Sequence, residues 1–148
     1  MEMIMLIGIP GSGKSSFCKE NLFDTHVRIS LDLVNTRNKE WQFMALAFSL
    51  HQRMVLDNTN VTKAERAVYI AEAKRNKFTL TGYYFESRLE TCLKRNEGRT
   101  GKGKINKVGV IAKHKALELP SYAEGFDKLY YVRIENDQFQ INPWNDEI

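Results

Sequence analysis

Short apolar runs alternate with amphipathic stretches along the chain, and their spacing predicts its secondary structure. Residues 3–9 form an apolar run that leads into a glycine loop, which is typical of a buried parallel strand. Short apolar or β-favouring segments predict four further strands. These lie at 27–30, 54–56, 78–85 and 129–134, and residues 138–141 are expected to form a hairpin with the last of them.

Helical patterns fill the intervals between these strands. An amphipathic helix is predicted over 39–53, where apolar residues recur at i, i+3, i+4 and i+7 and are expected to pack in the core: Trp41, Met44, Ala45 and Phe48. Thr62 and Glu65 form a capping box that begins a helix ending near Asn76. Three more helices are predicted, over 14–22, 87–96 and 108–117.

The alternation of strands and helices indicates an α/β fold. We expect one domain over residues 1–148, with a parallel sheet of about five strands flanked by helices. Ligands of such sheets bind at the carboxyl ends of the strands. The first three strands end close to Gly8, Asp32 and Asp57, so we expect these three positions at one edge of the sheet.

Composition and charge narrow the class of protein. Of the 148 residues 43% are hydrophobic and 27% charged, as in a folded globular protein, and no apolar stretch approaches the length of a membrane span. With no secretory leader pattern, we expect a cytoplasmic protein without a membrane partner. Cys18 and Cys92 lie in no metal or redox motif and are expected to be reduced and buried.

Positive charge is concentrated in one segment. Residues 94–115 hold eight Lys or Arg and one Glu, a net +7, which leaves −3 for the rest of a chain whose net charge is +4. Glycines at 98, 101 and 103 interrupt this segment. It is either a solvated surface loop or a mobile lid, over about residues 95–107, that covers an anionic ligand.

The strongest motif follows the first strand. Residues 8–15, with the sequence GIPGSGKS, match G-x-x-x-x-G-K-[ST] at every defined position. Glycines let the backbone turn its N–H groups toward phosphates, and the following helix directs its positive end at the same anion. We therefore expect a nucleoside triphosphate, ATP or another, with Mg²⁺. The predicted nucleotide-binding residues are Gly11, Ser12, Gly13, Lys14, Ser15 and Ser16, with Lys14 on the β- and γ-phosphates and Ser15 as the metal ligand.

The remaining polar residues favour a kinase over a hydrolase. A hydrolysing NTPase usually has a longer apolar strand that ends in a metal-binding Asp followed by an acid, and residues 54–57 match this pattern weakly. A kinase needs a carboxylate near the acceptor hydroxyl and cations over the transferred group. Asp32 can supply the carboxylate, although a helix cap or turn residue is an alternative. Arg95 and Arg99 can supply the cations.

The order of these motifs resembles the kinase domain of phage-type 5′-hydroxyl polynucleotide kinases. The resemblance covers residues 3–134 and is carried by the P-loop, Ser30-x-Asp32, the residues Asp57-x-Thr59-Asn60, the basic segment, and residues 124–127, EGFD. It implies that Asp32 is the general base, that Lys14 holds the donor, that Arg95 and Arg99 belong to the lid, and that Asp57 organises the cleft.

One position departs from that family. Its members have an arginine, which contacts the acceptor's phosphate, three residues after the catalytic aspartate, and this chain has Asn35 there. Arg37 is the candidate substitute. We therefore expect Ser30, Asp57 and Arg37 on the acceptor side.

Three functions remain open from the sequence. The first is transfer of the γ-phosphoryl group of ATP to the 5′-hydroxyl end of DNA or RNA, as in nucleic acid repair. Since the chain has no D-x-D-x-T phosphatase signature, 3′-end chemistry would need a separate partner. The second is a small-molecule kinase for a nucleoside, sugar or antibiotic, and the third a nucleotide-binding module without catalysis. The histidines show no metal-ligand spacing, and Trp41 is expected in the core unless it faces the cleft.

Overall fold

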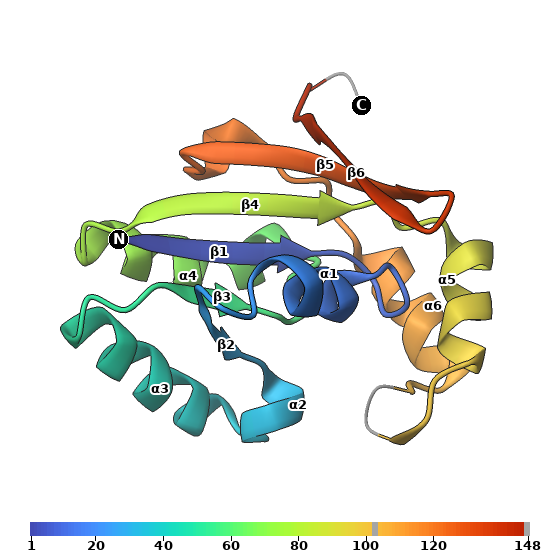
Figure 1. Cartoon of the computed structure of the whole chain (residues 1–148), viewed down its shortest axis with the longest axis horizontal. Coiled ribbons are helices and arrows are strands. Elements are labelled where there is room, and N and C mark those ends of the chain that lie inside the picture. Colours follow the sequence, from blue (N-terminus) through green and yellow to red (C-terminus); the bar gives the residue numbers. More distant parts are fainter. Residues whose placement is uncertain (102–103, 147–148) are drawn as a thin grey trace.

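A computed structural model describes residues 1–101 and 104–146 and shows one six-stranded sheet (Figure 1). The strands run in the order β2-β3-β1-β4-β5-β6. The first five are parallel, and β6 pairs antiparallel with β5 as the predicted hairpin. Their bounds are β1 (Glu2–Ile7), β2 (Val27–Ile29), β3 (Met54–Leu56), β4 (Thr79–Phe85), β5 (Lys128–Glu135) and β6 (Gln138–Pro143). The predicted α/β fold with a mostly parallel sheet is confirmed.

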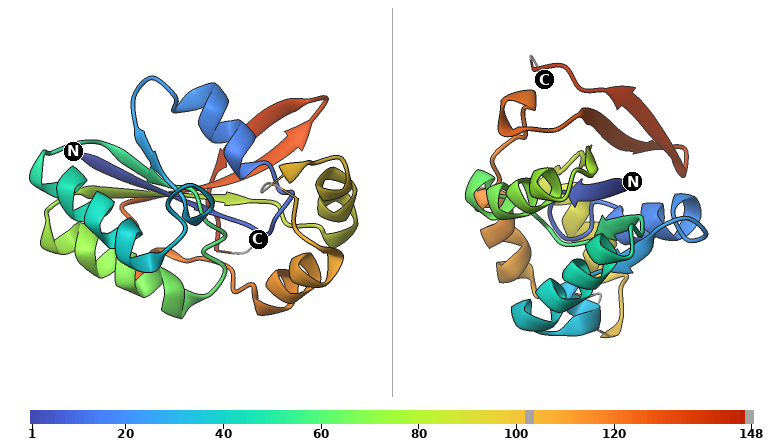
Figure 2. Two further views of the ribbon diagram at one scale, coloured as in Figure 1. Left: turned by 90° about the horizontal axis from the view of Figure 1, so that it is seen from below. Right: turned by 90° about the vertical axis from the view of Figure 1, so that its left-hand side faces the viewer.

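Helices cover both faces and the carboxyl end of the sheet. They are α1 (Lys14–Asn21), α2 (Leu31–Val34), α3 (Arg37–Ser49), α4 (Lys63–Arg75), α5 (Leu89–Glu97), α6 (Lys107–Ala116) and the 3-10 helix η2 (Tyr122–Glu124). The two views of Figure 2 place α3 and α4 on one side of the sheet and α1 on the other. Among the described residues, no helix is long and apolar enough to cross a membrane.

The central strand β1 explains why the sheet is covered on both faces. Met3, Met5 and Ile7 point into a core cluster shared with α3 and α4, while Ile4 and Leu6 point into a second cluster with Phe17 of α1. Side chains of a strand alternate between the two faces, so a continuous apolar run requires cover on each. All five side chains are buried, each in one of the two clusters.

A third apolar cluster fixes the helix pair α5 and α6 beyond the carboxyl end of the sheet (Figure 1). It joins Ile9 of the P-loop to Cys92 of α5 and Val110 of α6. Asn96 holds the connection between the two helices, since its Oδ1 accepts from the Ile105 N–H at 2.9 Å and its Nδ2 donates to the Ile105 carbonyl. The predicted lid, about residues 95–107, falls on this connection, and its Lys102 and Gly103 lie outside the described residues.

One predicted helix differs in its bounds, and one short helix was missed. The helix predicted over 39–53 begins at Arg37 because the Thr36 hydroxyl caps it, and it buries Ala47 where Ala45 was expected; Ala45 is exposed. The short helix α2 was not predicted. It begins after Ser30, whose hydroxyl accepts from the Asp32 N–H at 3.3 Å, and this cap stabilises four residues that have no apolar periodicity of their own.

Candidate active site

The P-loop joins β1 to α1 in a conformation that two of its glycines require. Gly11 and Gly13 have φ values of 86° and 102°, a region that L side chains rarely adopt. A Cβ on Gly11 would also lie 2.3 Å from the Cys92 carbonyl oxygen of α5. The loop therefore needs glycine here both for its left-handed turn and for the close approach of the helix.

Lys14 is the first residue of α1, and its ammonium group turns back into the loop. Its Nζ donates to the carbonyls of Gly8 at 2.8 Å and Ile9 at 3.1 Å. Burial lowers the pKa of Lys14 to about 8; Arg99 acts in the same direction, and Asp57 opposes it. Beside it, the Ser12 hydroxyl is buried without a hydrogen-bond partner. An unpaired buried hydroxyl is rare in folded proteins and fits a loop that binds a ligand.

Asp57, which was expected on the acceptor side, follows β3, the neighbour of β1, and this adjacency brings its carboxylate into contact with Ser15 of the P-loop. The Ser15 hydroxyl donates to Asp57 Oδ2 at 2.9 Å, and Arg28 Nε donates to the same oxygen at 2.8 Å. A hydroxyl and a carboxylate are oxygen ligands of the kind that Mg²⁺ takes. The described residues hold no group of three or more His, Cys, Asp or Glu that could bind a metal. Magnesium fits nonetheless, because it usually combines one or two protein ligands with waters and substrate phosphates.

Asp32 lies in the first turn of α2, just beyond β2. Two side chains fix the start of this helix, because Ser30 caps the Asp32 N–H and Asn58 Oδ1 accepts from the Leu31 N–H at 2.9 Å. Ser30 is buried and does not line the cavity; its hydroxyl bonds to the backbone at the start of α2 instead. The Asp32 side chain is exposed and lines the cavity described next.

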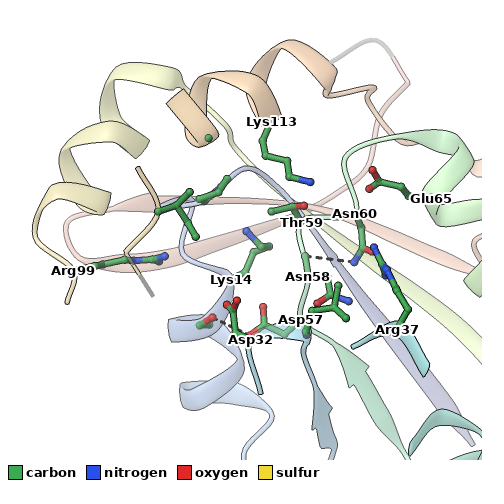
Figure 3. A pocket seen from close by; sticks show the side chains of 15 residues that line it. Lys14, Asp32, Arg37, Asp57, Asn58, Thr59, Asn60, Glu65, Arg99 and Lys113 are labelled. Atoms are coloured by element: carbon green, nitrogen blue, oxygen red, sulfur yellow. Dashed lines mark hydrogen bonds between the residues drawn. The ribbon is translucent and has the colours of Figure 1, made fainter. Parts of the chain in front are cut away.

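A cavity of about 270 Å³ lies at the carboxyl ends of the first three strands. Six of its lining residues are predicted site residues: Lys14, Ser15, Asp32, Arg37, Asp57 and Arg99. Figure 3 shows Arg99 on one side of the cavity, Arg37 and Glu65 on the opposite side, and Lys14, Asp32 and Asp57 between them. The structure thus brings the three strand ends together as the sequence predicted.

Other predicted residues lie outside the cavity lining. Arg95 is half-buried in α5, and its Nη1 lies 3.4 Å from the Gly11 carbonyl oxygen. It therefore contacts the backbone of the P-loop without lining the cavity. Gly11, Ser12 and Gly13 are buried in the loop, and Ser16 is exposed in the first turn of α1. Lys104 and Lys107 are exposed beside the predicted lid.

Asn35 stands where the family that the sequence resembles has an arginine, and its backbone conformation suits an asparagine. Asn35 ends α2 with φ 73°, a left-handed conformation that asparagine tolerates better than residues with long side chains. Two residues later Arg37 begins α3 and lines the cavity. An arginine two residues after Asn35 therefore lines the cavity.

Comparison with known proteins agrees with this geometry. The model of the AAA domain family AAA_33 matches residues 3–117. The chain belongs to this family. Of the related proteins, a putative bifunctional polynucleotide phosphatase/kinase of Acanthamoeba polyphaga mimivirus is 33% identical over 95% of this chain and 35% of its own length. A bifunctional polynucleotide phosphatase/kinase of Schizosaccharomyces pombe is 22% identical over 97% of this chain and 36% of its own.

This AAA_33 chain spans about a third of the length of those two relatives. Solved structures share its fold. Kti12 of Chaetomium thermophilum, in complex with ADP-AlF3, superposes with a TM-score of 0.65 at 17% identity, over 92% of this chain and 91% of that one. A gluconokinase of Sinorhizobium meliloti 1021 gives 0.58 at 16% identity, over 89% and 82%. The chain is a P-loop kinase-type domain that resembles polynucleotide kinases in sequence.

Glu40 of this AAA_33 domain is a buried carboxylate behind the candidate site, and sequence reasoning missed it. Its side chain is fully buried and accepts from the Tyr69 hydroxyl at 2.6 Å, Asn58 Nδ2 at 2.8 Å and Arg37 Nη1 at 3.2 Å. Burial first, and then the hydrogen bond to the Glu40 carboxylate, raise the pKa of Tyr69. Glu40 thus links Arg37 to Asn58, which caps α2 next to Asp32.

A second buried charge supports the same edge of the AAA_33 domain. Arg66 of α4 is fully buried, and its guanidinium forms two bonds to Glu124, at 2.8 and 3.1 Å. It also donates to the carbonyls of Asn60 and Val61 at 2.9 and 3.0 Å. Glu124 belongs to the segment 124–127, which the sequence showed only as a family likeness. Through Arg66 it fixes the loop after β3, which carries Asp57. Glu65 and Lys113 also line the cavity and were not predicted.

Proposed function

We propose that this chain is an ATP-dependent kinase that transfers the γ-phosphoryl group to the 5′-hydroxyl end of a polynucleotide. The observation that carries the proposal is one cavity that combines a phosphate loop with a carboxylate, Asp32, and a second arginine, Arg37, opposite Arg99. The names of the mimivirus and yeast relatives support a nucleic acid acceptor. The ADP-AlF3 in Kti12 supports a nucleotide in this fold.

The donor half of the site consists of the P-loop and its surroundings. Loop N–H groups and the amino end of α1 attract the phosphates, and Lys14 exchanges its two carbonyl contacts for phosphate oxygens. Ser15 and Asp57 are the residues that would hold Mg²⁺, which supplies neutralisation of charge on the phosphate oxygens when bound. Arg99 is close enough to Lys14 to lower its pKa, which supports a role beside the same phosphates.

The acceptor half begins at Asp32. Its carboxylate accepts the proton of the 5′-hydroxyl as the hydroxyl oxygen forms a bond to the γ-phosphorus and the bond to the bridging oxygen of ADP breaks. The proton remains on Asp32 until solvent takes it. Ser30 and Asn58 hold the first turn of α2 during this step, so the carboxylate does not have to be ordered when the acceptor arrives.

Arg37 provides a cation for the first phosphate of the acceptor strand. It lines the cavity on the side away from Arg99, so an acceptor bound there approaches the donor from the opposite direction. In-line transfer needs this arrangement of donor and acceptor. The basic segment 94–115, with its charge of +7, adds long-range attraction for a polyanion.

A small-molecule kinase is the second candidate, favoured by the structural likeness to the gluconokinase. Labelled ATP offered with a panel of 5′-hydroxyl DNA and RNA oligonucleotides, nucleosides, gluconate and other sugar acids separates the two. We expect label on oligonucleotides and none on the small alcohols. Label on a small alcohol alone would refute the polynucleotide proposal and leave a kinase. With Mg²⁺ and ATP present, the absence of label on every acceptor would favour a module without catalysis.

A further inference from the structure

A shallow aromatic groove adjoins the active-site cavity. Its volume is about 260 Å³ and its lining residues come from α3 and α4: Arg37, Trp41, Glu65, Val68 and Tyr69. Trp41 stacks on Tyr69 with ring centroids 5.4 Å apart and an interplanar angle of 25°. Trp41 is only partly buried, and 51% of Val68 is exposed. The tryptophan expected in the core therefore also forms part of a surface groove.

The groove continues the cavity on its acceptor side. Arg37 and Glu65 line both the cavity and the groove. In Figure 3 these two residues lie on the side opposite Arg99, away from the donor half of the site. An acceptor strand whose terminal hydroxyl is at Asp32 therefore passes Arg37 as it leaves the cavity and meets the groove directly afterwards.

The chemistry of the groove suits one flat ring that carries hydrogen-bond donors. Trp41 offers the largest aromatic face, Val68 adds apolar surface, Glu65 offers a carboxylate acceptor, and Arg37 offers a cation. Nucleobases stack on aromatic side chains regardless of sequence, and each carries a ring N–H or an exocyclic amino group that donates hydrogen bonds. A sugar acid has no aromatic face to stack on Trp41.

The stacked rings of Trp41 and Tyr69 are held in place by buried polar contacts. The Tyr69 hydroxyl donates to the buried Glu40 carboxylate at 2.6 Å and accepts from Arg37. Tyr69 is itself 3% exposed, so the ring beneath Trp41 is fixed by the core. A preorganised stacking surface loses little conformational freedom when a base binds.

We propose that the Trp41 groove binds a nucleobase adjacent to the first phosphate of the acceptor, while Arg37 binds that phosphate. This subsite rests on the proposed polynucleotide kinase activity and adds to it a base-stacking site that does not discriminate sequence. It favours an acceptor that carries both a base and the phosphate next to it, so a free nucleoside lacks one of the two contacts.

The test compares Trp41→Ala with wild type on two kinds of acceptor, one with all its bases and one with an abasic site at nucleotide 1 or 2. On the complete oligonucleotide, Trp41→Ala should raise the acceptor KM by about 5- to 150-fold, the range that alanine substitution gives for a stacked base. The KM for ATP should stay within about twofold. The abasic acceptor should show the same loss with the wild-type enzyme and little further loss with Trp41→Ala.

Two variants serve as controls. Trp41→Phe keeps an aromatic face and should recover most of the acceptor affinity. Phe43→Ala removes an aromatic ring that is 50% exposed on the same helix but lines a different groove, with Leu33 and Val27, and it should leave the acceptor KM unchanged. The abasic comparison on the wild-type enzyme needs no variant, so it also holds if Trp41→Ala folds poorly.

The possible failures are distinguishable. If wild type labels oligonucleotides but neither abasic position changes the acceptor KM, the subsite is refuted and the proposed function stands. An equal effect of Trp41→Ala on complete and abasic acceptors refutes it in the same way. If wild type labels no oligonucleotide, both the polynucleotide function and the subsite that rests on it fail.

Discussion

Replacing Glu40 with glutamine tests whether the buried carboxylate organises the acceptor half of the site. The substitution keeps the shape of the side chain but exchanges one acceptor oxygen for an NH₂ group. Glu40 accepts from Tyr69 and Arg37 on Oε1 and from Asn58 on Oε2. With Oε1 kept toward Tyr69, the new NH₂ group faces the Asn58 NH₂ group, and both are donors.

The magnitude follows from these contacts. An unsatisfied buried donor costs about 1–3 kcal/mol, and the loss of charge assistance on the remaining bonds costs about 1 kcal/mol more. We expect the free energy of unfolding to fall by about 2–4 kcal/mol, which lowers Tm by about 4–16 °C in a domain of this size. If Asn58 rotates its amide to satisfy the glutamine, its NH₂ group meets the Leu31 N–H, and α2 loses its second cap. The kcat should then fall by about tenfold to a hundredfold, because the first turn of α2 no longer fixes the position of the Asp32 carboxylate.

The assay pairs urea unfolding with steady-state kinetics for Glu40→Gln and a control, Glu72→Gln. Glu72 forms a surface pair with Arg75 on α4, and such pairs contribute about 0–1 kcal/mol. The control should therefore change neither stability nor kcat appreciably. If Glu40→Gln unfolds within about 1 kcal/mol of wild type and keeps its kcat, the carboxylate does not organise the site and the reasoning is wrong.

Further predictions concern the residues with proposed catalytic roles. Lys14→Ala should abolish turnover at all ATP concentrations, measured as label transfer. Without ATP the pKa of Lys14 is about 8, and bound phosphates favour its protonated form. The affinity for ATP should therefore be independent of pH below about pH 7 and weaken as the pH rises above 8. Calorimetry at several pH values can check this. Asp32→Asn should cost on the order of 10²–10⁴ in kcat with little change in ATP affinity. Arg99→Ala should lower kcat by on the order of 10³–10⁵, whereas the double change of Lys104 and Lys107 to alanine should raise only the acceptor KM and flatten its salt dependence. Equal KM effects in the last two variants would mean that Arg99 only attracts the acceptor.

The parts of this molecule that sequence could predict are those set by local chemistry. The P-loop follows from glycines that the turn needs, the cap of α4 from Thr62, which accepts from the Glu65 N–H, and the strands from short apolar runs. Adjacency of the strand ends followed from the parallel sheet. The cavity formed by Lys14, Asp32 and Asp57 was therefore within reach of sequence reasoning, apart from its depth and shape.

The parts that could not be predicted depend on contacts between distant segments. Glu40 lies at a buried helical position that apolar periodicity assigns to a hydrophobic residue, and only its partners from α4 and the loop after β3 explain a carboxylate there. The i, i+3 pair with Arg37 was the one signal available in the sequence. Trp41 was ambiguous for the same reason, because the groove beside it exists only once α3 and α4 pack together.

The loop after β3 connects the P-loop to the first turn of α2, which carries Asp32. Residues 57–60 bond to the starts of two helices and to the end of β1. Asp57 accepts from Ser15 of α1, and Asn58 accepts from the Leu31 N–H of α2. At the end of β1, the Thr59 carbonyl accepts from the Gly8 N–H and Asn60 donates to the Leu6 carbonyl. These bonds measure 2.8 to 3.0 Å. The phosphate loop and the Asp32 helix do not need direct contacts with each other, because both are bonded to this loop. Arg66, paired with Glu124, bonds to the Asn60 carbonyl of this loop. A substitution at that buried pair should therefore displace the P-loop and the Asp32 helix together. We expect it to lower kcat and to affect the KM for ATP and the KM for the acceptor about equally.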